Sequence, residues 1–264
     1  MAAEDKTHNP VADLSAKEFS LKVDGVPVPV SSVAYAGRDP VDWLLLIDSS
    51  NSMRTEELWK PSIGAAVQQV SSLITERGDR VAVAVFSDKP GLLQELTTDP
   101  GLIEAAISRI QPSGATALYD SLVSGFGYLS KHSPPEHRKI IWVITDGGDN
   151  QSSTTLDEVR ESASGAGVPL FFSIPGSSQR TPASDEENAL VQLARASGGA
   201  KLHSGSKKEC TEVAKEIVTF SRKMYRIDFA LASAAGNHKI EVATSRPKVK
   251  LLGPKQTLRF RENK

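Results

Sequence analysis

In Trp43-Leu-Leu-Leu-Ile-Asp48-Ser-Ser-Asn-Ser-Met53 an apolar run ends abruptly in a carboxylate and alternating hydroxyls, and the rest of the chain is best interpreted from this segment. Residues 44–47 have the continuous hydrophobicity of a strand that is covered on both faces, as in a parallel sheet. Asp48, Ser50 and Ser52 then supply only oxygen donors, which favour a hard cation such as Mg²⁺. A polar turn with a helix N-cap has the same composition, so this stretch alone leaves both interpretations open.

Two later segments carry matching polar residues. Lys139-Ile-Ile-Trp-Val-Ile-Thr-Asp146 is a second apolar run that ends in an aspartate, and Thr116 stands in a glycine-containing loop that leads into a helical pattern. In an open α/β sheet, ligands bind beyond the carboxyl ends of the strands, where Asp48 and Asp146 are both expected. The three segments together resemble the metal-ion-dependent adhesion site of von Willebrand factor type A domains, and the sequence before them resembles the flank of a bacterial group of such proteins.

The resemblance implies a specific ligand set and a specific function. Its metal ligands would be Asp48, Ser50, Ser52, Thr116 and Asp146, holding Mg²⁺ (or Mn²⁺ or Ca²⁺) with one position left for an aspartate or glutamate of a partner protein or peptide. The implied function is metal-dependent adhesion or assembly, without catalysis. Two positions depart from the family pattern: Asn51 stands where many relatives have glycine, and Gly148 where an acid is frequent, with Asp149 as a candidate substitute.

The order of the remaining patterns predicts an α/β fold. Further apolar strands are expected at residues 80–86 and 168–174, and helical spacing recurs after each strand, for example at residues 63–74 and 118–129. Alternating strands and helices imply βαβ units. We therefore predict a doubly wound, mainly parallel, Rossmann-like sheet flanked by helices.

The two flanks predict a separate β structure. We expect a disordered stretch at residues 1–12, a β flank at 13–37, the von Willebrand-type domain at 41–224 and a second β flank at 225–261. A lone two-stranded hairpin is at best marginally stable, so we expect the flanks to pair as one small β module. The alternative is that both flanks cover the surface of the α/β domain.

Composition sets further limits. The 264 residues are 39% hydrophobic and 24% charged, as in an ordinary globular protein, and no apolar run is long enough for a transmembrane helix. The start has neither the basic nor the apolar region of a signal peptide, so the protein is cytoplasmic or an exported protein whose signal has been removed, and we expect the second. The single Cys210 excludes an internal disulfide and is expected on a helix face.

Charge and motifs bear on other functions. Residues 222–264 contain 11 Lys and Arg against 3 Asp and Glu. This basic tail could bind an anionic surface or nucleic acid. Simpler interpretations are that it docks within the chain or that its charges keep exposed strand faces solvated, so no nucleic-acid partner is expected. No phosphate-binding, dinucleotide-binding or hydrolase motif is present. A Mg²⁺-dependent hydrolase that uses Asp48 and Asp146 is the alternative function, and a purely structural scaffold is a third.

Overall fold

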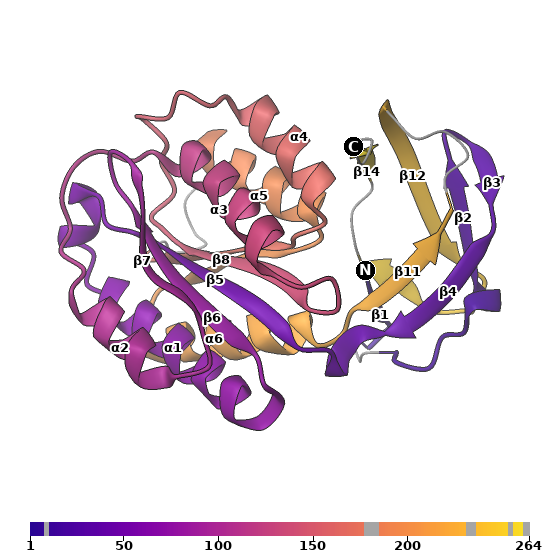
Figure 1. Cartoon of the computed structure of the whole chain (residues 1–264), viewed down its shortest axis with the longest axis horizontal. Coiled ribbons are helices and arrows are strands. Elements are labelled where there is room, and N and C mark those ends of the chain that lie inside the picture. Colours follow the sequence, from indigo (N-terminus) through magenta and orange to yellow (C-terminus); the bar gives the residue numbers. More distant parts are fainter. Residues whose placement is uncertain (8–10, 177–184, 231–235, 253–255, 261–264) are drawn as a thin grey trace.

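The computed structural model describes residues 1–7, 11–176, 185–230, 236–252 and 256–260, and Figure 1 shows that they form two lobes. One lobe is a sheet between two layers of helices, and the other is built from strands of both flanks. No helix in these ranges is long and apolar enough to cross a membrane.

The central sheet has six strands in the order β10-β9-β8-β5-β6-β7. All neighbours are parallel except β6 and β7. The strands are β5 (Val41–Asp48), β6 (Arg80–Phe86), β7 (Pro90–Thr97), β8 (Arg138–Ile144), β9 (Leu170–Pro175) and β10 (Ala200–Ser204). The chain runs from β5 to one edge and then from β8 to the other. This doubly wound order confirms the predicted α/β fold with a mainly parallel sheet.

Three helices cover each face of the sheet (Figure 1). Alternate residues of β5 divide between two hydrophobic cores: Trp43, Leu45 and Ile47 on one face, and Leu44 and Leu46 on the other. This alternation is expected for a strand buried on both sides. The first core contains α1 (Trp59–Arg77), α2 (Pro100–Ser108) and α6 (Lys207–Ser221); the second contains α3 (Leu118–His132), α4 (Leu156–Ala166) and α5 (Asp185–Ser197).

The β lobe contains all the remaining strands. Its sheets have the orders β14-β12-β2-β3, β11-β4 and β1-β13. Each sheet therefore pairs strands that precede the central sheet in the sequence with strands that follow it. The strands are β1 (Ala2–Glu4), β2 (Phe19–Val23), β3 (Val26–Val28), β4 (Val30–Tyr35), β11 (Tyr225–Phe229), β12 (Gly236–Thr244), β13 (Lys250–Leu252) and β14 (Gln256–Phe260). The boundaries of the lobes as folding units stay predictions.

Tyr225 lies at the centre of the β lobe. Its ring packs 5.6 Å from the ring of Phe19 and 5.3 Å from that of Tyr35, measured between centroids. Its hydroxyl accepts a hydrogen bond from the Leu14 backbone N–H at 3.0 Å and donates one to the Val11 carbonyl at 2.9 Å. One buried side chain of the second flank therefore holds two segments of the first.

The start of the chain differs from the expected disordered stretch at residues 1–12. Ala2 and Ala3 are 1% exposed, and β1 pairs with β13 of the far flank. The prediction of disorder is therefore wrong for β1. The sequence does not predict this strand, because alanine has little preference for strands. The burial of β1 depends on pairing with a strand about 250 residues away in the sequence.

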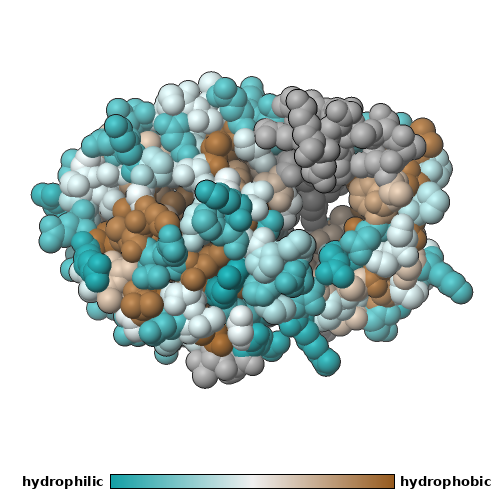
Figure 2. Space-filling model, in the orientation of Figure 1, coloured by the Kyte–Doolittle hydropathy of each residue, from teal (hydrophilic) through white to brown (hydrophobic). Residues whose placement is uncertain are grey.

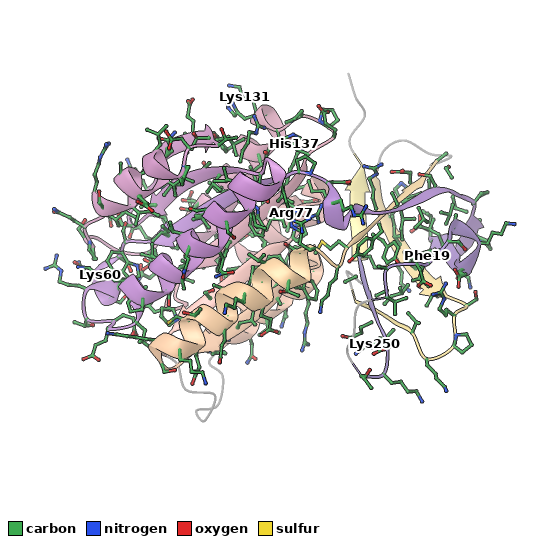
Figure 3. All side chains as sticks on the ribbon, turned by 90° about the horizontal axis from the view of Figure 1, so that it is seen from below. Phe19, Lys60, Arg77, Lys131, His137 and Lys250 are labelled. Atoms are coloured by element: carbon green, nitrogen blue, oxygen red, sulfur yellow. The ribbon has the colours of Figure 1, made fainter. Side chains whose placement is uncertain are left out.

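The β lobe joins the amino ends of the central strands. Asp79, before β6, is fully buried and forms an ion pair with Arg222 at the end of α6. Figure 3 shows Phe19 and Lys250 of the β lobe on the side of Arg77, which ends α1, whereas Lys60 lies at the opposite end of that helix. The loop after β5 leads to the Lys60 end, so the predicted site faces away from the β lobe.

Candidate functional site

The candidate site lies where the sheet reverses its winding direction. β5 and β8 are neighbours, yet α1 after β5 and α4 after β8 pack on opposite faces. Such a switch point leaves a crevice at the carboxyl ends of the two strands, where ligands bind in doubly wound folds. Asp48 is the last residue of β5, and Thr145 and Asp146 follow β8 directly. The two predicted aspartates are thus on the same crevice.

Asp48 is completely buried and held by two neutral donors. Its Oδ1 accepts a hydrogen bond from the Ser50 backbone N–H at 2.8 Å, and its Oδ2 accepts one from the Thr145 hydroxyl at 2.6 Å. The indole N–H of Trp59 donates to the Asp48 carbonyl at 3.0 Å, which ties the strand end to α1. The carboxylate is therefore fixed in position before any ligand arrives.

The electrostatic surroundings of Asp48 disfavour its charge. Its pKa is raised to about 6, mainly by burial and also by the nearby Asp146 carboxylate, although the hydrogen bonds from Thr145 and Ser50 act in the opposite direction. The half-buried carboxylate of Asp146 and the fully buried carboxylate of Asp48 thus face the same crevice. No cationic side chain contributes to the pKa shift of Asp48. A bound cation would offset this repulsion.

Ser50 and Ser52 place their hydroxyls together. Ser50 is the N-cap of a short 3-10 helix at residues Asn51–Arg54, and its Oγ lies 3.0 Å from the Oγ of Ser52. Asn51 begins this helix and has no positive φ, since Asp24 and Lys248 are the non-glycine residues with positive φ in the described chain. Glycine and asparagine adopt left-handed backbone more readily than other residues, but position 51 does not require that conformation here.

The loop of Thr116 is attached to both other segments. The Asn51 N–H donates to the Gly114 carbonyl at 3.0 Å, which links this loop to the one after β5. The Thr116 N–H donates to the side-chain oxygen of Asn150 at 2.9 Å, and its carbonyl accepts from the Asn150 N–H at 3.0 Å. The structure therefore brings the three predicted segments together, with Thr116 itself buried.

Asp149 does not replace the acid that the family pattern would place at Gly148. Its Oδ2 accepts hydrogen bonds from the Tyr119 N–H at 2.9 Å and from the Ser152 hydroxyl at 2.6 Å. Tyr119 stands in the first turn of α3, whose N–H groups have no partner within the helix. Asp149 is therefore a capping residue of α3.

Three residues that were not predicted from the sequence also shape the site: Thr145, Asn150 and Trp59. Each stands next to or near a predicted segment, but its role depends on side-chain direction across the fold. A threonine directly before Asp146 at a strand end is a usable signal, since neighbouring residues on a strand point to opposite faces. For Asn150 and Trp59 no sequence signal specifies the partner.

The donor set fits a hard cation. The five predicted ligands offer carboxylate and hydroxyl oxygens, which Mg²⁺, Mn²⁺ and Ca²⁺ prefer over the nitrogen and sulfur ligands of zinc or copper sites. Within the ranges that the structure describes, no three His, Cys, Asp or Glu side chains are grouped as metal ligands. Any cation in this crevice would therefore depend on the Ser50, Ser52 and Thr116 hydroxyls.

Comparison with known proteins points to one family. Residues 43–148 match the family model described as von Willebrand factor type A domain. This segment contains all five predicted ligands. No curated protein sequence matches the chain significantly.

Solved structures share the fold at low sequence identity. A von Willebrand factor type A protein from Catenulispora acidiphila is 18% identical with a TM-score of 0.56, over 79% of this chain and 50% of that one. The PilB minor pilin from Streptococcus sanguinis is 14% identical with a TM-score of 0.56, over 70% of this chain and 62% of that one. The match thus spans about half to three fifths of these longer proteins.

A third similar structure contains a metal. Proximal thread matrix protein 1 from the mussel byssus, solved with a zinc-occupied MIDAS motif, is 18% identical with a TM-score of 0.53. The likeness covers 70% of this chain and 48% of that one. At these identities the comparison establishes the shared fold.

Proposed function

We propose that residues 43–148, which match the family model described as von Willebrand factor type A domain, belong to an adhesion or assembly module that grips an acidic side chain of a partner through a divalent cation. The similar structures include a minor pilin and a thread matrix protein of the mussel byssus, both named for assembled structures. They support a role in protein contacts rather than catalysis.

The cation would be held by Asp48, Ser50, Ser52, Thr116 and Asp146. When bound, a divalent cation supplies a concentrated positive charge that a further carboxylate oxygen can ligate. The chain's own residues set the conditions for it: Asp48 is oriented by Ser50 and Thr145, and the hydroxyls of Ser50 and Ser52 lie side by side. Mg²⁺ is proposed as the ion, with Mn²⁺ or Ca²⁺ as substitutes.

The observation that carries the proposal is the buried, uncompensated carboxylate of Asp48 at the switch point. Burial of a charged group without an opposite charge is costly, and a structure that retains it usually does so for function. Two carboxylates and three neutral hydroxyls would leave a dication incompletely ligated. An aspartate or glutamate of a partner is then the ligand with the complementary charge.

Calorimetric titration with Mg²⁺ tests the site. The Asp48→Ala variant should bind Mg²⁺ more than about 100-fold more weakly than the wild-type chain, because a ligand is lost outright. Asp157→Ala is the matched control, since that aspartate is 87% exposed on α4 and outside the site. Equal Mg²⁺ affinity of Asp48→Ala and the control would contradict the site assignment.

A second arm separates binding from catalysis. The wild-type chain and Asp48→Ala are assayed with Mg²⁺ against a panel of phosphate ester and peptide substrates. We expect no turnover by either protein. Turnover by the wild-type chain that is lost in Asp48→Ala would instead identify a Mg²⁺-dependent hydrolase at the same aspartates.

A further inference from the structure

An apolar groove lies between α3 and β7, beside the candidate metal site. It has a volume of about 80 Å³, and its floor is formed by Leu44, Leu46 and Ala84 of the second hydrophobic core. Figure 2 shows a hydrophobic patch over this part of the molecule, in the region of β7 and α3. A cavity of 150 Å³ accommodates the six carbons of benzene, so about half that volume has room for an aliphatic side chain of roughly three to four carbons.

The rim of the groove exposes large apolar side chains. β7 has β6 on one side and no strand of the described chain on the other. Leu92 on this strand lines the groove and is 46% exposed, and its neighbour Leu93 is 37% exposed. Of the four large hydrophobic residues that are notably exposed in the described ranges, these two lie together at one sheet edge. Such a patch favours contact with a partner.

The groove suits an aliphatic side chain better than a polar one. Two hydroxyls in its wall are already used: Ser121 donates to the Ala117 carbonyl at 2.6 Å, and the Tyr128 hydroxyl accepts from the Leu96 N–H at 2.9 Å. A polar side chain placed on the remaining leucine and alanine surface would lose its hydrogen bonds to water without replacement.

The edge itself is poorly suited to strand addition by a second copy of the chain. Pro90 has no N–H to donate, and the pairing of β7 with β6 is interrupted by register shifts. Proline and bulges are features that protect sheet edges from pairing. Insertion of one side chain into the groove therefore fits this surface better than an extended backbone ladder.

The groove and the metal site are close enough for one ligand. Leu46 precedes Asp48 by two residues on β5, about 7 Å along a strand. The loop at residues 87–89 connects β6 to β7 and contacts the Thr116 loop: the Ala117 N–H donates to the Ser87 carbonyl at 2.7 Å. An extended peptide covers a separation of about 10 Å with three residues.

We propose that the partner segment carries two anchors, an acidic side chain for the cation and an aliphatic side chain about three residues away for the α3–β7 groove. This inference rests on the proposed function and specifies its ligand. The carboxylate gives the contact its metal dependence, and the aliphatic residue selects among acidic segments. Specific recognition otherwise has no source, because any exposed carboxylate could ligate the ion.

Synthetic peptides of glycine and serine test the two anchors in saturating Mg²⁺. One peptide carries a single glutamate, a second adds leucine three residues away on either side, and a third has the leucine with glutamine in place of glutamate. Fluorescence anisotropy should show metal-dependent binding of the first, about tenfold tighter binding of the better leucine peptide, and no measurable binding of the third.

Two variants of the groove test whether the tighter binding of the leucine peptide arises there. Ser124→Phe, which fills the groove from the exposed wall of α3, and Leu92→Lys should each remove the tenfold gain and leave binding of the simple glutamate peptide unchanged. Val26→Lys is the control, since Val26 is 64% exposed on β3 of the β lobe. A gain that persists in both groove variants would overturn the proposal.

The other outcomes are distinct. Equal metal-dependent binding of the glutamate and leucine peptides would overturn the groove and leave the proposed function standing. If all peptides bind without the metal, or if no peptide binds at all, both the groove proposal and the proposed function are wrong. Self-association in sedimentation experiments that is lost in Leu92→Lys would show that a second copy covers the groove, which also overturns the proposal.

Discussion

Replacing Asp48 by asparagine should stabilise the metal-free protein. The side chain keeps its shape, but the buried charge disappears. The pKa of Asp48 is raised from 3.8 to about 6, and each unit corresponds to 1.36 kcal/mol, so the ionised carboxylate costs roughly 3 kcal/mol of stability at pH 7.5. Asparagine has one side-chain oxygen, so it can accept from Ser50 or from Thr145 but not from both, and the lost hydrogen bond offsets part of this gain. A net stabilisation of roughly 1 to 2 kcal/mol remains.

The sign follows from the direction of the shift. Between pH 3.8 and about 6, Asp48 keeps its proton in the folded protein but has lost it in the unfolded chain. The destabilisation by the buried charge is therefore complete above this window and absent below it. The difference between Asp48→Asn and the wild-type chain should therefore shrink as the pH falls toward 4. Urea denaturation in EDTA at pH 7.5 and at pH 4 measures both values.

Addition of Mg²⁺ at pH 7.5 should make the wild-type chain more stable to unfolding than Asp48→Asn, the reverse of their order in EDTA. A ligand present at 100 times its dissociation constant stabilises the folded state by about 2.7 kcal/mol, and only the wild-type chain should gain this. If Asp48→Asn is less stable than the wild-type chain in EDTA and gains equally from Mg²⁺, Asp48 is neither the costly buried charge nor the metal ligand.

Three further predictions concern the β lobe. Tyr225→Phe should lower the free energy of unfolding by about 1 to 2 kcal/mol, because two buried backbone groups lose their partner, and should leave Mg²⁺ affinity unchanged; a change in that affinity would contradict the separation of the two lobes. Glu18 has its pKa lowered to about 2, mainly by the hydrogen bond from Arg246, so it stabilises the fold above pH 4.5 and this contribution is lost as the pH falls toward 2; Glu18→Gln should flatten the acid limb of the urea stability curve, and an unchanged limb would exclude the pair as its cause. Deletion of residues 226–264 should expose residues 13–36 to protease while Mg²⁺ binding survives, whereas unchanged protection would mean that the first flank does not depend on the second.

Much of the central lobe could be predicted because its signals are local. An apolar run that ends in Asp48 specifies a buried strand and the position of its polar end at once, and the same holds for the strand before Asp146. The order of strands and helices then restricts the topology to few solutions, since parallel strands need crossover connections. The crevice between β5 and β8 follows from that topology.

The details that the sequence does not specify depend on contacts between distant residues. Asp149 is one residue from the position of the expected acid, yet it caps α3, and only the direction of its side chain distinguishes these roles. Ala2 and Ala3 become a strand because β13 is available to pair with them. The groove at Leu92 arises from the distance between α3 and β7, which no local pattern encodes.

Paramagnetic relaxation can show whether a partner carboxylate reaches the metal. The protein is loaded with Mn²⁺, and proton relaxation is measured for a glutamate-containing peptide in fast exchange with it. We expect strong paramagnetic relaxation of the protons next to the glutamate carboxylate, weaker effects along the peptide, and loss of both in Asp48→Ala. Peptide binding without this relaxation pattern, or with the same pattern in Asp48→Ala, would contradict the claim that the module grips its partner through a cation at Asp48.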